Sequence, residues 1–185
     1  MLFNNPNKVK LAIGAFLLVA IVAWATTAHS AERTLTFSGG RTIVRAETTV
    51  ADLAVSQPRF VGDAALEAGI TLIGDSTYGT ELVPNYLAKN AVFPLPVKTM
   101  VEVPRHQAGN IAARLALVDG FGNFDIGLGA VWMQHADYLN GSNLNFCLLL
   151  GYRWQHLQLR YQHISNAGTS PPNVGRDMVL LGWRF

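Results

Sequence analysis

A histidine, a serine and an aspartate lie near the C-terminal end of the sequence, in a segment whose pattern predicts strand, loop and strand. His163 and Ser165 are two residues apart, and Asp177 follows a stretch rich in proline, glycine and asparagine. A serine hydroxyl becomes an effective nucleophile when an adjacent imidazole accepts its proton, and a third group can fix the tautomer of that imidazole. These residue types therefore predict a hydrolase of the Ser-His-acid kind.

The direction of these side chains indicates the substrate. Residues two apart on a strand project from the same face, so His163 and Ser165 are neighbours on one side. That side carries apolar residues further back along the same strand, and Asp177 shares the parity of Val179 and Phe185. A catalytic group on an apolar face favours an enzyme whose substrate is the surrounding lipid.

The C-terminal half of the chain alternates apolar and polar residues with a period of two, which predicts strands with unlike faces. Several of these runs reach about ten residues, the length of a tilted strand that crosses a bilayer. A further strand is predicted at 65–75, and two more within 33–56, interrupted by Ser38-Gly39-Gly40. The total is eight, an even number and the smallest usual for a membrane barrel. The five C-terminal strands are expected at 111–117, 124–132, 144–153, 157–162 and 177–185.

Connections of two lengths alternate along the chain, as in barrels with short periplasmic turns and long external loops. We expect tight turns at 119–123 and 153–155, and longer connections at 134–142, 166–176 and 76–108. The chain ends on Phe185, with Trp183 two residues before it, which resembles the last strand of bacterial outer-membrane proteins. If Phe185 ends in the periplasm, then His163, Ser165 and Asp177 lie at the outer-leaflet end of the barrel.

The first 30 residues are expected to be a secretory signal peptide, and residues 31–185 the barrel. Lys8 and Lys10 precede an apolar run at 11–25, which is followed by small residues suited to cleavage. An uncleaved anchor helix is the alternative, because 11–30 contains no Lys, Arg, Asp or Glu.

Composition limits the classes of function. Charged residues are 14% of the chain and hydrophobic residues 50%, which is unusual for a soluble domain. A net charge of +2, scattered along the chain, gives no reason to expect nucleic acid as a partner. The single cysteine, Cys147, excludes an internal disulfide, and we expect neither a metal nor an organic cofactor.

Other side chains are assigned structural roles. Arg114 and Arg160 are expected to pair in the lumen with acidic residues such as Asp125. The aromatic residues expected in interfacial belts are Trp132, Tyr152, Trp154 and Trp183. The histidines expected to be structural or on the surface are His106, His135 and His156.

The segment His163-Ile164-Ser165-Asn166-Ala167-Gly168, followed by Pro172-Asn173-x-Gly175-x-Asp177, resembles the core motif of the outer-membrane lipid A 3-O-deacylases, the PagL family. In that family the motif spans the last two strands of an eight-stranded barrel. Weaker similarity extends back through 142–146 and 125–129, so the resemblance covers the C-terminal third well and the N-terminal half poorly.

The resemblance implies hydrolysis of the ester-linked acyl chain at the 3-position of lipid A. It assigns Ser165 as the nucleophile, His163 as the general base and Asn173 to the oxyanion hole, with backbone NH groups near Gly168 or Gly175 as helpers. Asp177 falls where the family commonly has a glutamate as the orienting acid. Its side chain is one methylene shorter, and small misplacements of catalytic groups can lower the rate.

The sequence thus predicts an all-β, eight-stranded antiparallel transmembrane β-barrel of the bacterial outer membrane that acts on lipid A, with a homodimer left open. Two other functions are retained: a non-catalytic barrel, either adhesin or structural, and an esterase acting on another outer-leaflet lipid. A soluble periplasmic β-sandwich is the weakest alternative.

Overall fold

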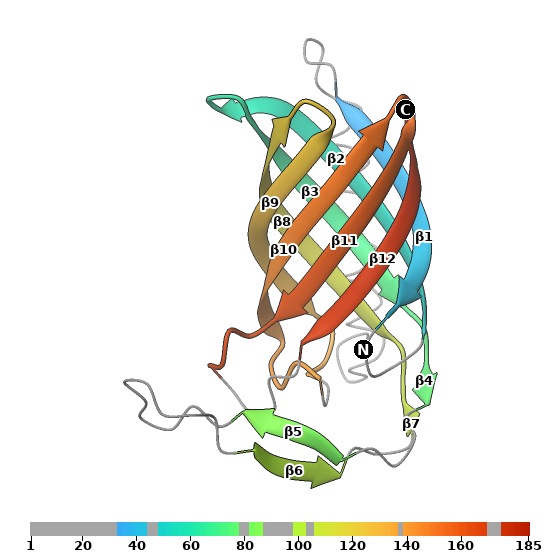
Figure 1. Ribbon diagram of the computed structural model, residues 1–185, viewed down its shortest axis with the longest axis vertical. Coiled ribbons are helices and arrows are strands. Elements are labelled where there is room, and N and C mark those ends of the chain that lie inside the picture. Colours follow the sequence, from blue (N-terminus) through green and yellow to red (C-terminus); the bar gives the residue numbers. More distant parts are fainter. Residues whose placement is uncertain are drawn as a thin grey trace, which may run out of the picture.

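The computed structural model is a closed antiparallel barrel of eight strands, ordered β1-β12-β11-β10-β9-β8-β3-β2 (Figure 1). Residues 33–43, 48–77, 82–86, 98–102, 106–136, 139–169 and 175–185 are described, with side chains omitted over 76–107. The predicted signal peptide, 1–30, lies outside these residues. The strands are β1 (Thr34–Thr42), β2 (Thr49–Val61), β3 (Ala64–Ile73), β8 (Asn110–Phe121), β9 (Phe124–Met133), β10 (Leu144–Trp154), β11 (Leu157–Ser165) and β12 (Arg176–Arg184). The predicted fold is confirmed, and closure of the sheet contradicts the β-sandwich.

The two ends of the barrel differ in their connections. At one end, which we call the turn end, two-residue turns join β2 to β3, β8 to β9 and β10 to β11. Gly62 and Gly122 occupy these turns with φ of 59° and 62°, the left-handed region that glycine adopts without strain. The opposite end, which we call the loop end, carries the longer connections. External loops of membrane barrels are the long ones, so the loop end is the outer end.

The connection from β3 to β8 contains structure that the sequence did not predict. Two short antiparallel pairs lie there, β4 (Ser76–Thr77) with β7 (His106–Gln107) and β5 (Leu82–Tyr86) with β6 (Lys98–Glu102). In Figure 1 both pairs lie below the loop end. The segment expected to be one structureless loop, 76–108, is therefore partly paired.

Two strand limits also differ from expectation. Ser38-Gly39-Gly40 does not interrupt a strand but lies within β1, paired with both β2 and β12. A Cβ at Gly40 would lie 1.9 Å from the Val179 carbonyl oxygen, so this glycine permits close approach of β1 and β12. The turn expected at 119–123 is only Gly122-Asn123, because β8 continues to Phe121.

The outer surface of the barrel is apolar. Side chains such as Leu128, Leu181 and Leu115 point outward and are more than half exposed, as expected for a barrel surrounded by lipid. Exposed aromatic residues gather at the turn end, where they form the belt typical of a membrane interface: Phe37, Phe121, Phe124, Tyr152, Trp154 and Trp183. Among the described residues, no helix is long and apolar enough to cross a bilayer.

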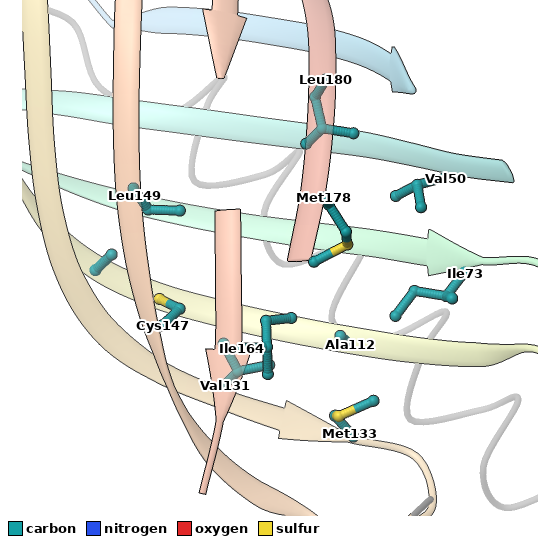
Figure 2. Packing of buried hydrophobic residues seen from close by; sticks show 11 residues of the cluster. Val50, Ile73, Ala112, Val131, Met133, Cys147, Leu149, Ile164, Met178 and Leu180 are labelled. Carbon is teal, nitrogen blue, oxygen red and sulfur yellow. The ribbon is translucent and has the colours of Figure 1, made fainter. Parts of the chain in front are cut away.

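The lumen near the loop end is filled by apolar side chains. Val50, Ile73, Met133, Ile164 and Met178 lie close to the ends of their strands and are at least 96% buried. Figure 2 shows these residues directed inward from separate strands. This cluster lies behind the ends of β11 and β12 and gives them a packed support.

The middle of the lumen is polar and ionic. The Arg114 guanidinium lies 3.0 Å from Asp52 Oδ1 and 2.8 Å from Glu67 Oε1. Arg160 lies 2.7 Å from Glu67 Oε2, so Glu67 on β3 joins an arginine of the neighbouring strand β8 to an arginine of β11 on the opposite wall. The expected pairing of both arginines with acidic residues of the lumen is confirmed, but Asp125, named as an example of such a partner, is wrong, because it instead lies 2.9 Å from Arg153 near the turn end.

Candidate active site

His163 and Asp177 are directly opposite each other on β11 and β12 and both point outward. The distance from His163 Nδ1 to Asp177 Oδ1 is 2.8 Å, which is a hydrogen bond. The His163 side chain is 32% exposed and that of Asp177 is 17% exposed. Cross-strand pairing thus brings the aspartate to the imidazole even though its side chain is shorter than that of glutamate.

Ser165 occupies the next outward position of β11, where the strand ends. Strand geometry separates it from His163 by about 7 Å along the backbone. Both residues are described, and no hydrogen bond joins the Ser165 hydroxyl to the imidazole. Because catalytic hydrogen bonds are often long in the absence of substrate, this spacing is compatible with a nucleophile and its base.

Gly175 provides the space that the imidazole occupies. A Cβ at this position would lie 2.7 Å from His163 Cε1, and the residue has φ of 77°. The Gly175 NH donates a hydrogen bond of 2.9 Å to the Leu139 carbonyl, which fixes the start of β12. The expected role of the Gly175 NH as a helper in the oxyanion hole is therefore not met in this structure, because that NH is already bonded; the glycine instead shapes the space around the histidine.

Tyr161 is a member of the site that the sequence did not reveal. Its hydroxyl donates a short hydrogen bond to Asp177 Oδ1, the oxygen that also contacts His163. It lies two residues before His163 on the outward face of β11. A tyrosine has an apolar ring and a polar hydroxyl that usually finds a hydrogen-bond partner. Its position on the same face as His163, two residues away, was therefore the signal in the sequence that could have placed it in the site.

Asn166 fixes the loop that follows Ser165. Its side chain is buried, donates a short hydrogen bond to the Asn140 carbonyl and accepts one of 2.9 Å from the Gly168 NH. Ala167 and Gly168 then turn the chain with φ of 52° and 80°. Asn140 comes from the connection between β9 and β10, so two loops meet behind the site. Asn173, the predicted oxyanion residue, lies outside the described residues.

The described side chains contain no group of three or more His, Cys, Asp or Glu residues that could hold a metal ion. Cys147 is buried and points into the lumen, away from the outward residues.

Part of this chain is similar to a known protein family. Residues 119–185 match the family model described as lipid A 3-O-deacylase (PagL). The predicted resemblance is confirmed. This segment contains β9 to β12 and every outward residue of the site discussed above.

A solved structure, described as the crystal structure of the outer membrane enzyme PagL, is similar to the whole barrel. The match covers 82% of this chain and 98% of that chain, with a TM-score of 0.54 and 18% sequence identity. The fold is therefore that of an outer-membrane β-barrel. A comparison with curated proteins gave no match.

Proposed function

We propose that this protein is a lipid A 3-O-deacylase of the bacterial outer membrane, which hydrolyses the ester-linked acyl chain at the 3-position. The observation that carries the proposal is the hydrogen-bonded pair His163–Asp177, with Ser165 beside it, on the outward surface of the barrel at its loop end. The family match over 119–185 supports the same substrate.

In this proposal, Ser165 Oγ attacks the ester carbonyl carbon while His163 Nε2 accepts the serine proton. Asp177 accepts a hydrogen bond from the Nδ1–H group of His163, so Nε2 is the ring nitrogen that is left to act as the base. Collapse of the tetrahedral intermediate breaks the bond to the sugar oxygen, which takes the proton from His163. Water, activated by the same histidine, then releases the fatty acid from Ser165. Asn173 is proposed to stabilise the oxyanion.

The position of the residues supports a membrane lipid as substrate. His163, Ser165 and Asp177 belong to the same outward face as Val179 and Leu181, which faces the acyl chains. The loop end is the outer end of the barrel, where lipid A forms the outer leaflet. A site in the lumen would not reach this ester, because the lumen behind it is filled by the apolar cluster.

The test is mass spectrometry of lipid A from bacteria that produce the wild-type chain or the Ser165→Ala variant. We expect loss of one 3-linked acyl chain with the wild type only, while both proteins form a heat-modifiable barrel. Unchanged lipid A with inserted wild-type protein would reject this substrate. Full activity of Ser165→Ala would instead reject the assigned nucleophile.

A further inference from the structure

Among the barrel strands that the structure describes, charged or titratable side chains on the outward face near the loop end lie on three neighbouring strands. His163 lies on β11, Asp177 on β12 and Arg41 on β1, which pairs with β12 where the barrel closes. The outward positions of β9 and β10 at the same end are apolar: Ala130, Trp132, Leu144, Phe146 and Leu148. Arg41 is therefore part of the polar surface that contains the proposed catalytic residues.

The register places Arg41 close to Asp177. Arg41 is paired with Val179, the outward residue that follows Asp177 on β12. Diagonal neighbours of this kind lie about 7–8 Å apart at Cα, within reach of a long side chain. Two residues nearer the loop end, the Ile43 NH donates a hydrogen bond of 3.0 Å to the Asp177 carbonyl oxygen.

Arg41 is exposed, and its depth suits contact with a lipid headgroup. It is the last residue but one of β1. The next residue, Thr42, donates a backbone hydrogen bond of 3.0 Å to the Thr48 carbonyl just before β2, so Arg41 lies close to the loop end of the barrel. An arginine on the lipid side of a barrel is costly at the midplane but tolerated near the interface. None of the ion pairs between described residues includes Arg41.

Guanidinium groups bind phosphate through charge-assisted, often bidentate hydrogen bonds. Since the proposed substrate is a phosphorylated glycolipid, its headgroup carries a suitable anion beside the ester that is cleaved. We propose that Arg41 binds a phosphate group of the lipid A headgroup and so orients the acyl ester toward Ser165. This inference rests on the proposed function and adds a residue that discriminates phosphorylated from dephosphorylated substrate.

The experiment compares kcat/KM of the purified full-length barrel for lipid A and for lipid A whose phosphates have been removed, in the same detergent micelles. The wild type is expected to prefer the phosphorylated lipid. In Arg41→Gln this preference should fall about tenfold, the size of one charge-assisted contact. Arg41→Lys keeps the charge without the bidentate geometry and should retain an intermediate preference.

Arg59→Gln is the matched control, because Arg59 is an exposed arginine on β2 near the turn end. It should keep the wild-type preference. An Arg41→Gln variant with an unchanged preference would overturn the role of Arg41, while activity of the wild type on either lipid would leave the proposed function standing. A wild-type barrel inactive on both lipids would instead overturn the proposed function itself.

Discussion

The Tyr161 hydroxyl and the His163 imidazole contact the same carboxylate oxygen, Asp177 Oδ1. Tyr161 and His163 are consecutive outward residues of β11, and Asp177 reaches both from β12. Two donors on one oxygen restrict the rotation of the aspartate side chain. The tyrosine is therefore a positioning residue that holds the acid in contact with the histidine, whereas the serine and histidine would contact the substrate.

Replacement of Tyr161 by phenylalanine tests this role. Tyr161→Phe removes the hydroxyl but keeps the ring, and we expect kcat to fall about 3- to 10-fold, the equivalent of one hydrogen bond of about 1 kcal/mol. KM should remain close to that of the wild type, because the hydroxyl acts through Asp177. Steady-state kinetics with lipid A in micelles measures both constants. Tyr152→Phe, at the turn end, is the control, and equal losses in the two variants would contradict a local role.

Lengthening the acid tests whether the site is adapted to aspartate. Asp177 already lies 2.8 Å from His163, so the additional methylene of Asp177→Glu has to be accommodated by displacement of the carboxylate. We expect kcat to fall about tenfold, as small misplacements of catalytic groups are costly. The double variant Tyr161→Phe with Asp177→Glu should lose less than the product of the two single losses, because it removes the hydroxyl that confines the acid. Strictly multiplicative losses would show that Tyr161 and the acid act independently.

Gly175 should be essential for the position of the imidazole. An alanine there would place Cβ 2.7 Å from His163 Cε1 and adopt φ of 77°, which costs about 1–2 kcal/mol in backbone strain. We expect Gly175→Ala to lower kcat at least tenfold. Gly122→Ala is the matched control, because Gly122 has φ of 62° and no heavy atom within 4 Å of an added Cβ. It should lose a similar amount of stability, measured by heat modifiability, but keep its activity. Equal activity of the two variants would contradict the assignment.

The ionic network of the lumen is expected to stabilise the barrel without taking part in catalysis. Glu67→Gln leaves Arg160 without its carboxylate partner and should destabilise the barrel by about 3–5 kcal/mol, as expected when one member of a buried pair is removed. Asp125→Asn breaks a partly exposed pair with Arg153 and should cost about 1 kcal/mol or less. Urea unfolding in lipid vesicles, followed by tryptophan fluorescence, measures both changes. A smaller effect for Glu67→Gln than for Asp125→Asn would contradict this view of the network.

The sequence by itself determined the number of barrel strands, the faces of the C-terminal strands and the motif. Alternation with a period of two is a local property, so the outward direction of His163, Ser165 and Asp177 could be predicted without knowing which strands are neighbours. The glycines of β1 were wrongly expected to interrupt a strand. Gly40 is required by the close approach of β12, a strand about 140 residues later in the chain. The composition of a short segment cannot indicate such a distant contact.

Only the tertiary structure decided which side chains meet. The pairing of His163 with Asp177, the bond from Tyr161 and the support of Asn166 by Asn140 depend on strand register and loop packing. Parity correctly placed Arg114 and Arg160 in the lumen with acidic partners, but it does not give the depth of a residue there, so Asp125 was wrongly named as a partner. Arg41 lies on the strand next to Asp177 because closure of the barrel joins the first strand to the last, and such long-range pairing is fixed by the whole sheet rather than by local sequence.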